Sequence, residues 1–226
     1  MRSHLQIDAP DIEVTDFAGL EIQWDRRVLR PRPWTAEQGR WAADILADVP
    51  EGPILELCCG AGHIGLVAAR ASDRDLVQVD GDPVAAAYAR RNAAAAGISS
   101  DVRHAGLDVA VEDGERFPMV LADPPWLPTA GIVAYPDDPP HAVDGGVDGD
   151  DVLLECLAVA VEHLAPGGHL VVQVGLPQQI ERVEEWLAGH AADGSDGGPG
   201  PLAVVGVRDR RPGGFLVHVG PPGGGA

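Results

Sequence analysis

The chain has 226 residues, of which 45% are hydrophobic, and this is enough for one well-buried α/β domain but short for two. The formal net charge at pH 7 is −19, and because nucleic-acid affinity comes largely from basic side chains that neutralise phosphates, we expect no nucleic-acid partner without a basic partner subunit. No stretch reaches the about 18 apolar residues that span a membrane, and residues 1–16 lack the apolar core of a signal peptide, which predicts a cytoplasmic protein.

Residues 1–30 alternate weakly between apolar and polar positions, which predicts an N-terminal strand or hairpin extension that covers one edge of the core. The following segment, RPRPWTAEQGRW, is kept extended by two prolines until Thr35. Thr35 and Gln38 form a capping-box pattern, so we expect a helix to begin there. The apolar residues that recur on one face of this helix are Trp41, Ile45, Leu46 and Val49.

Residues 54–70, with the sequence ILELCCGAGHIGLVAAR, predict a short apolar strand, a glycine-containing turn and the start of a helix. Gly60, Gly62 and Gly65 suit a backbone with positive φ, or a place where no side chain stands between the chain and a ligand. Glu56 is an acid at a strand position where a hydrophobe would pack better. This arrangement is typical of a nucleotide-like cofactor site, although close packing of a strand on a helix also selects glycine.

A second apolar run, LVQVD at 76–80, ends in Asp80, 20 residues after Gly60. In a unit of strand, turn, helix and strand, a carboxylate at this place binds ribose hydroxyls. Asp82 and Pro83 then predict a helix N-terminus, and Gly97 predicts the end of that helix.

Strands and helices continue to alternate through the rest of the chain. We expect strands at 101–104, 118–122 and 169–175, and helices at 150–165 and about 178–190. Composition predicts a flexible connector at 191–200, a terminal hairpin around RDRRPGG and a disordered tail at 221–226. The predicted fold class is therefore α/β and Rossmann-like: about seven strands, mostly parallel with a C-terminal antiparallel hairpin, and helices on both faces.

The chain has three cysteines, Cys58, Cys59 and Cys156. A disulfide between the two adjacent cysteines is sterically disfavoured, and the spacings match no metal site. The sequence therefore predicts small packing residues in a reducing compartment, and no bound metal.

A third apolar run, MVLA, ends in Asp123, Pro124, Pro125 and Trp126. The nitrogen of an amide or an exocyclic amine is a weak nucleophile, so a site that methylates it must hold its N–H groups with hydrogen-bond acceptors. The Asp123 side chain and the Pro124 carbonyl oxygen are two such acceptors, and the consecutive prolines keep them rigid. Trp126 offers a flat face to a planar group or a cation. The alternative is a rigid loop whose prolines only end a strand.

Residues 127–149 show no regular pattern and form a longer segment than a connection needs, which predicts a substrate-covering loop. The segment and the residues just after it are rich in aspartate, at Asp137, Asp138, Asp144, Asp148, Asp150 and Asp151. These residues either provide solubility and a helix N-cap, or form an acidic rim that attracts a cationic partner.

Six sequence blocks together resemble the class I S-adenosylmethionine-dependent methyltransferases and, more narrowly, the HemK/PrmC family. The blocks are RVLRPRPWTAEQ, LELCCGAGHIGL, VQVDGDPVAAAYARRNAAAAG, ADPPWLP, AVDGGVDGDD and LAPGGHLVVQVG, within about residues 27–175. Enzymes of this family methylate the side-chain amide of a glutamine in translation release factors. The resemblance implies a class I methyltransferase domain over 31–220, with S-adenosyl-L-methionine as its cofactor.

The resemblance also implies roles for individual residues. It places the target nitrogen at Asp123, Pro124, Pro125 and Trp126. It places the cofactor at Thr35, Glu56, Cys58, Gly60, Gly62, Ile64, Asp80, Gly81, Gly106 and Leu107. Glu37 falls beside Thr35 in the block that lies near cofactor and substrate in the family.

The chain departs from the family pattern in three places. The family usually has Asn-Pro-Pro-Tyr where this chain has Asp123 and Trp126, and because an ionised aspartate only accepts hydrogen bonds, an amine target stays open. Gly106 replaces an acid that commonly faces the adenine amino group, so we expect the backbone around Leu107 to serve. Residues 1–30 leave no room for the helical N-terminal domain with which family members often grip the release factor.

These observations predict an N-methyltransferase that transfers the methyl group directly to a planar nitrogen. A protein or peptide glutamine is the preferred acceptor. The alternatives are the adenine amino group in RNA or DNA, a small-molecule amine in a biosynthetic pathway, and a cofactor-binding protein without catalysis. Neither a metal nor a membrane has a predicted role.

Overall fold

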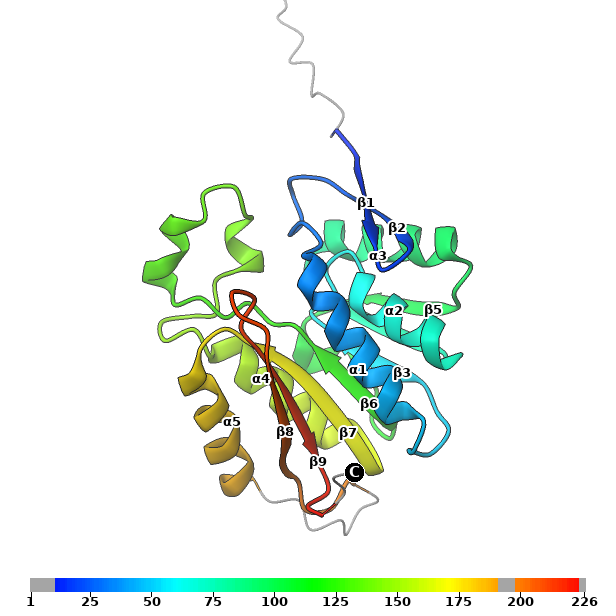
Figure 1. The fold of residues 1–226 in the computed structure, drawn as a ribbon, viewed down its shortest axis with the longest axis vertical. Helices are drawn as coiled ribbons and strands as arrows, with labels where there is room; N and C mark the ends of the chain where they lie inside the picture. The colour runs from blue at the N-terminus through cyan, green and yellow to red at the C-terminus, as the bar shows by residue number, and fades with distance from the viewer. Residues whose placement is uncertain (1–10, 191–197, 224–226) are drawn as a thin grey trace, which may run out of the picture.

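The chain folds around one sheet of seven strands with helices on both faces (Figure 1). The computed structural model describes residues 11–190 and 198–223. The strands are β3 (Ile54–Leu57), β4 (Leu76–Asp80), β5 (Ser100–His104), β6 (Phe117–Ala122), β7 (Leu164–Val174), β8 (Ala203–Asp209) and β9 (Phe215–Gly220). Their order is β5-β4-β3-β6-β7-β9-β8, and β9 is antiparallel to both β7 and β8 while the other pairs are parallel. The predicted fold class is confirmed.

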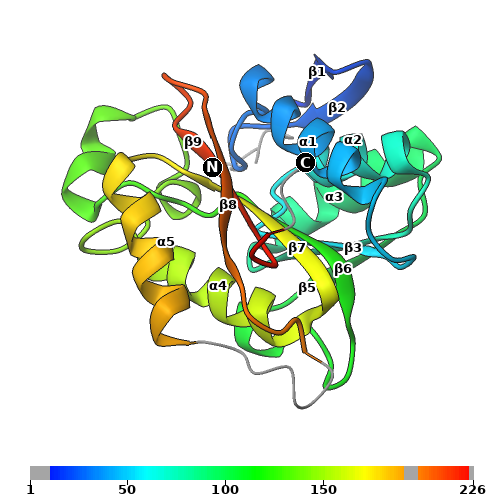
Figure 2. The ribbon, with the colours of Figure 1, turned by 60° about the horizontal axis from the view of Figure 1, so that its bottom comes forward.

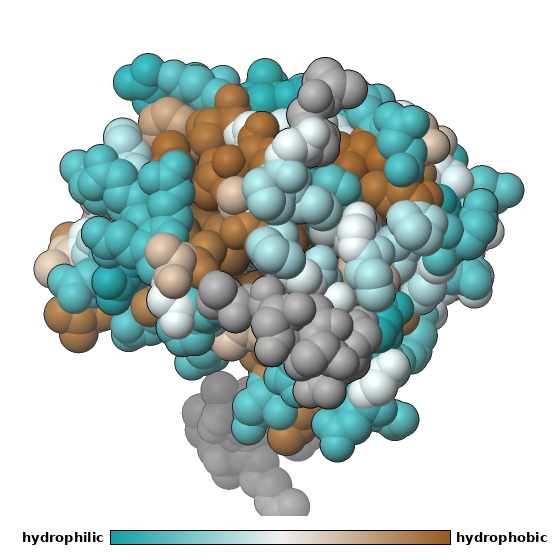
Figure 3. Space-filling model, turned by 90° about the horizontal axis from the view of Figure 1, so that it is seen from below, coloured by the Kyte–Doolittle hydropathy of each residue, from teal (hydrophilic) through white to brown (hydrophobic). Residues whose placement is uncertain are grey.

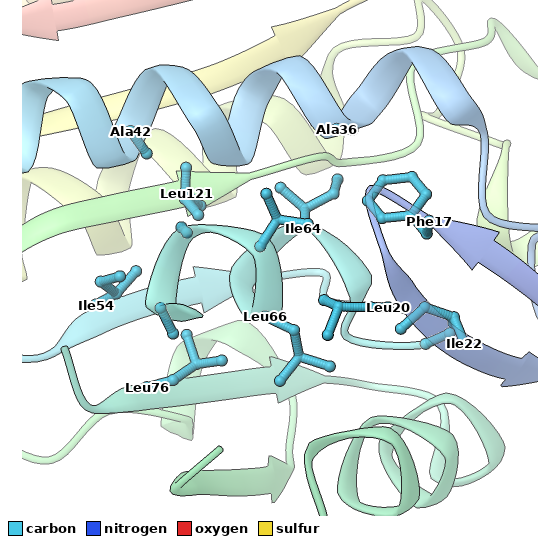
Figure 4. Packing of buried hydrophobic residues seen from close by; sticks show 14 of the residues in the cluster. Phe17, Leu20, Ile22, Ala36, Ala42, Ile54, Ile64, Leu66, Leu76 and Leu121 are labelled. Atoms are coloured by element: carbon cyan, nitrogen blue, oxygen red, sulfur yellow. The ribbon is translucent and has the colours of Figure 1, made fainter. Parts of the chain in front are cut away.

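The helices form two layers, one on each face of the sheet (Figures 1 and 2). One layer is α1 (Ala36–Leu46), α2 (His63–Ser72) and α3 (Pro83–Ala96), and the other is α4 (Asp151–His163) and α5 (Pro177–Gly189). Alternate strand residues divide between the layers: Ile54 and Leu121 pack with α1 and α2 (Figure 4), whereas Leu55 and Val120 pack with α4. Because both faces are covered, the central strands are continuously apolar.

The ends of α3 follow the sequence signals. The Asp82 carboxylate accepts hydrogen bonds from the N–H groups of Val84 at 3.2 Å and Ala85 at 3.1 Å, and Gly97, with a φ of 67°, ends the helix. The boundary between α4 and β7 is different from the predicted one. The Pro-Gly-Gly segment continues the strand, so β7 already begins at Leu164 and α4 ends before it.

The capping box predicted at Thr35 and Gln38 is wrong. A 3₁₀ turn, η1 (Pro33–Thr35), precedes α1, and the Thr35 hydroxyl donates to the Arg32 carbonyl oxygen at 2.9 Å. The buried Gln38 carboxamide donates to the carbonyl oxygens of Ala122 and Val171, both at 2.9 Å. Gln38 therefore joins α1 to the last residue of β6 and to β7. Its side chain makes this tertiary contact instead of capping the helix.

The N-terminal segment contains the predicted hairpin, β1 (Glu13–Phe17) and β2 (Leu20–Trp24), but the hairpin does not extend the large sheet. It is a separate two-stranded sheet whose second strand packs on α2 and α3. Leu20 and Ile22 are buried near Leu66 (Figure 4) because the alternation of β2 turns its apolar side toward the helices. Residues 1–10 of the predicted extension lie outside the described residues.

At the C-terminus, β8 and β9 flank RDRRPGG as predicted. Residues 191–197 of the predicted connector and 224–226 of the predicted tail lie outside the described residues. Across the described ranges, no helix combines the length and the hydropathy that a membrane crossing needs. Figure 3 shows one face of the molecule, where hydrophobic residues form separate patches bordered by hydrophilic ones.

Candidate active site

A cavity of about 480 Å³, the first cavity, lies beyond the carboxyl ends of β3, β4 and β6. These strands are neighbours, so the residues that follow them meet at one edge of the sheet. The volume is within the range of about 300–1,000 Å³ that small-molecule sites occupy. Of the residues predicted to bind the cofactor, the first cavity is lined by Cys58, Gly60, Ile64, Asp80, Gly81, Gly106 and Leu107.

The glycine turn lines the first cavity at Gly60 but not at Gly62. Gly60 has a φ of 54°, and no atom lies within 4 Å of the point where a Cβ would stand. Gly62, with a φ of 82°, faces the Gln78 side chain at 2.7 Å and Ala89 at 3.1 Å from the corresponding point. Gly62 is therefore required for packing of the turn on its neighbours, and its contact with the cofactor stays a prediction.

Asp80 is fixed at the end of β4 by two backbone donors. Its Oδ2 atom accepts a hydrogen bond from Gly60 N–H at 2.7 Å, and its Oδ1 atom accepts one from Asp82 N–H at 2.8 Å. Burial raises the pKa of this carboxyl above its usual range, while the two N–H groups oppose the shift. Each oxygen retains a further lone pair, so the anchored carboxyl can also accept from a ligand in the first cavity.

Glu56 lines neither cavity, so a direct contact with the cofactor stays a prediction. The side chain is 2% exposed, with Oε1 accepting from Gly65 N–H at 2.9 Å and Oε2 accepting from the Gln78 carboxamide at 2.6 Å. Gly65 is required here because a Cβ at this position would clash with the Glu56 carboxyl group. Burial raises the Glu56 pKa to about 8. Glu56 therefore joins β3 to α2 beneath the turn.

A second cavity, of about 300 Å³, shares Leu29, Asp123, Pro125 and Ala142 with the first. Its polar and aromatic lining includes Arg32, Trp34, Thr35, Asp123, Trp126, Tyr135, Asp138 and Gln173. No described residue donates a hydrogen bond to the Asp123 carboxyl group, and burial raises the pKa of that group to about 7. Asp123 therefore stands at the junction of the two cavities with its acceptor capacity free.

Thr35 and Trp126 both line the second cavity rather than the first. The Trp126 ring packs against Gly175, where any side chain would overlap it. The Thr35 hydroxyl lies 3.5 Å from Nε2 of His63, a buried residue of the first cavity whose pKa is lowered to about 4 by burial. Thr35 therefore lies at the boundary between the two cavities, and its contact with the cofactor stays a prediction.

The loop at 127–149 is folded, and several of its residues line the second cavity, while its predicted role as a cover for the substrate stays a prediction. It contains two 3₁₀ turns, η3 (Thr129–Ala134) and η4 (Pro140–Ala142). Backbone hydrogen bonds join the start of the loop to its later part. Leu127 N–H donates to Val143 O at 3.0 Å, and Gly145 N–H donates to Leu127 O at 2.8 Å. The buried Gln179 of α5 donates to Gly149 O at 2.7 Å and to Trp126 O at 3.2 Å, so α5 holds both ends of the loop.

Three of the six aspartates in and after this loop have partners inside the protein. Asp138 pairs with Arg32 at 2.6 Å, Asp150 pairs with Arg182 at 2.9 Å, and Asp144 accepts from the Thr129 hydroxyl at 2.8 Å. Asp137, Asp148 and Asp151 are exposed. The two arginine pairs neutralise part of the negative charge of the acidic rim. The contacts of Asp138 and Asp144 also hold the loop in its folded position.

Several cavity residues gave no clear signal in the sequence. Val28 and Leu29 follow the N-terminal hairpin, His141 and Ala142 come from the loop, and Pro212 and Gly213 come from the terminal hairpin. Gln173 did carry a signal, since it is a polar residue inside an apolar strand, as Glu56 is.

Other features of the described residues fit the predicted absence of a metal role without testing it. No group of three or more metal-ligating side chains occurs in the described ranges. The three cysteines are free, with the sulfur atoms of Cys58 and Cys156 3.8 Å apart. A larger hollow of about 610 Å³ between α4 and η2 (Leu107–Val109) contains none of the predicted catalytic residues.

Comparison with known sequences places the chain among methyltransferases. It matches the family described as "Methyltransferase small domain" over residues 42–134. It is 32% identical over 176 residues to the ribosomal protein uL3 glutamine methyltransferase of Bradyrhizobium diazoefficiens, covering 72% of this chain and 55% of that protein. It is 31% identical over 164 residues to the release factor glutamine methyltransferase of Deinococcus radiodurans, covering 70% and 58%. The chain thus spans less than two thirds of the length of these relatives.

Comparison with solved structures agrees on the fold. The 16S rRNA N2 G1207 methyltransferase of T. Thermophilus, solved in complex with AdoMet and guanosine, matches with a TM-score of 0.61 and 17% identity, over 95% of this chain and 51% of that chain. At this identity the likeness shows the fold alone. The predicted class I architecture is confirmed by this match and by the strand order.

Proposed function

Because the chain belongs to the HemK/PrmC-like methyltransferases by sequence, we propose that it transfers a methyl group from S-adenosylmethionine to the side-chain amide of a protein glutamine. The observation that carries this proposal is the junction of the two cavities at Asp123 and Pro125. A methyl donor in the first cavity and an acceptor in the second would meet at these residues.

The lining of the first cavity fits S-adenosylmethionine. The open space above Gly60 lets a ligand approach the backbone, and the anchored Asp80 carboxyl offers acceptors to ribose hydroxyls. Ile64 and Leu107 provide apolar surface for an adenine ring, and Gly106 adds no side chain beside it. When bound, S-adenosylmethionine supplies a methyl group on a positively charged sulfur.

The chain supplies acceptors for the target nitrogen. Asp123 and Pro124 line the second cavity, and no described residue donates to the Asp123 carboxylate or to the Pro124 carbonyl oxygen, so both can accept from the N–H groups of an amide. Holding the nitrogen in the reacting geometry can lower a barrier by about 7–11 kcal/mol. With a pKa of about 7, the Asp123 carboxylate can also take up the proton that the nitrogen releases.

The opening of the second cavity suits a peptide segment. Trp34 and Tyr135 line it and are 37% and 45% exposed, and exposed aromatic residues at a site are typical of contact with a protein partner. The two relatives are named for glutamine in uL3 and in a release factor. The net charge of −19 disfavours the nucleic-acid alternative.

The proposal is tested by incubating methyl-tritiated S-adenosylmethionine with a cell lysate and either wild-type protein or Asp123→Ala. We expect label in protein with the wild type only, and mass spectrometry should place the added methyl group on a glutamine. Label in RNA or DNA would support the adenine alternative, and label in small molecules would support a biosynthetic role. Either result would contradict the proposed acceptor.

A further inference from the structure

Gln173 is a buried side chain beside Asp123. It is 4% exposed and lines the second cavity but not the first. The register of β6 and β7 ends with the pair Ala122 and Val172, and Asp123 and Gln173 are the residues that follow these two, Asp123 just beyond β6 and Gln173 within β7. Paired residues of adjacent strands point to the same face of a sheet, and the strands are about 4.8 Å apart. The two side chains therefore stand next to each other in the second cavity.

The Gln173 carboxamide has no hydrogen-bond partner among the described residues. Gln38, which packs against the same two strands, differs in that its Nε2 donates to the carbonyl oxygens of Ala122 and Val171. Buried polar side chains are nearly always hydrogen-bonded. A carboxamide left free at the wall of a cavity is therefore available to a ligand that enters the cavity.

A glutamine side chain presents two kinds of group to this cavity. Its N–H groups need acceptors, which Asp123 and the Pro124 carbonyl oxygen provide, whereas its carbonyl oxygen needs a donor. The Thr35 hydroxyl already donates to the Arg32 carbonyl oxygen, and Nη2 of the Arg32 guanidinium donates to both carboxylate oxygens of Asp138. The other side-chain N–H and O–H groups of the cavity belong to Trp34, Trp126 and Tyr135, which are all more exposed than Gln173.

We propose that the side-chain N–H of Gln173 donates a hydrogen bond to the carbonyl oxygen of the target amide and so selects a primary amide as the acceptor. This assignment rests on the proposed function. Asp123 binds the nitrogen end of the amide and Gln173 binds the oxygen end, which fixes the plane of the group. An amine or an apolar side chain of the same length satisfies only one of the two residues, or neither.

The test uses the full chain loaded with S-adenosylhomocysteine and two probes, N-acetylglutamine methylamide and N-acetylnorleucine methylamide. Dissociation constants are measured by NMR titration of wild type, Gln173→Met and Gln178→Met. Gln178 is exposed on α5 and lines neither cavity, so its variant is the matched control. We expect wild type and the control to prefer the glutamine probe, and Gln173→Met to lose roughly 5- to 100-fold of that preference. Equal affinity for S-adenosylhomocysteine in all three proteins shows that the fold is intact.

A second readout follows the amide itself. The Gln173 side-chain N–H resonances, identified by their absence in Gln173→Met, should shift with the glutamine probe and not with the norleucine probe, while those of Gln38 stay in place. Gln173→Glu, which loses the donor when ionised, should lose the preference as Gln173→Met does. If wild type prefers glutamine and both variants keep the whole preference, the assignment of Gln173 is wrong and the proposed function stands. If wild type shows no preference, the glutamine acceptor is wrong, and the role of Gln173 with it.

Discussion

Two carboxyl groups of the site differ in how the protein holds them. Both oxygens of Asp80 accept backbone N–H groups, whereas Asp123 accepts no hydrogen bond from a described residue. Burial raises the pKa of both groups, that of Asp123 to about 7. Asp80 is therefore a fixed acceptor suited to a cofactor that stays in one position, and Asp123 remains free for a group that reacts.

The first prediction concerns Asp80. Hydrogen bonds to charged groups contribute about 1.5–3 kcal/mol, so Asp80→Ala should weaken S-adenosylmethionine binding roughly 10- to 150-fold. Asp137→Ala, which removes an exposed acid that lines neither cavity, is the control for net charge. Unchanged affinity of Asp80→Ala in calorimetric titration would remove Asp80 from the cofactor site.

The second prediction concerns Glu56, whose pKa is raised to about 8 by burial. The unfolded chain loses this proton near the ordinary value of 4.5, whereas the folded protein keeps it until about pH 8. The group therefore contributes stability that is full below pH 4.5 and is lost as the pH rises through 8. Glu56→Gln cannot titrate, so its free energy of unfolding should fall less than that of wild type over this range. An equal fall in chemical denaturation at several pH values would show that Glu56 does not titrate with a raised pKa.

At the scale of elements, the sequence predicted correctly those helices, strands and turns that depend on residues close together in the chain. The strand, glycine turn and helix at 54–70 and the capped helix at 83–96 follow from apolar spacing, glycine conformation and an aspartate N-cap. The capping box failed because Gln38 is used between α1 and two strands that come much later in the sequence. A polar residue in an apolar segment predicts that its side chain is buried and hydrogen-bonded. The residue that it bonds to depends on the fold and cannot be found from the sequence nearby.

The loop at 127–149 had no regular pattern because its structure depends on contacts with other elements. Gln179 lies in α5, lines neither cavity, and holds the carbonyl oxygens of Trp126 and Gly149. Gln179→Ala should therefore loosen the loop and lower turnover while leaving S-adenosylmethionine affinity unchanged. Hydrogen exchange should rise within 127–149 in this variant and stay at the wild-type level in Gln178→Ala. Unchanged exchange in Gln179→Ala would mean that the loop is held by its internal contacts alone.

At the scale of the whole molecule, charge decides which partners are available. The chain carries 35 acidic and 16 basic residues, and phosphate binding depends on basic side chains. The purified protein should show no salt-sensitive retention of duplex DNA or transfer RNA near physiological ionic strength. Micromolar binding that falls steeply with salt would overturn the preference for a protein substrate.

The overall architecture was predictable from the sequence, but the junction of two cavities was not. A mostly parallel sheet follows from the alternation of strands and helices with a terminal hairpin, and one rim of ligand-binding residues follows from the parallel strands. The second cavity gathers Leu29, Trp126, Gln173 and Gly213, which come from four distant segments. No periodicity or spacing in one sequence connects such residues, because only the packed fold brings them together.

The central claim is that Asp123 joins a methyl-donor cavity to an acceptor cavity, and the most direct test compares cofactor affinity with turnover on the labelled glutamine substrate. Asp123→Ala should keep S-adenosylmethionine affinity nearly intact while turnover falls by orders of magnitude, which is the pattern of a lost transition-state contact. Asp123→Asn, whose carbonyl oxygen still accepts, should keep substantial activity on an amide. Wild-type kcat/KM should rise with pH through an apparent pKa near 7, and this rise should be absent in Asp123→Asn. If both variants turn over at the wild-type rate, the segment Asp-Pro-Pro-Trp is only structural and the account is contradicted.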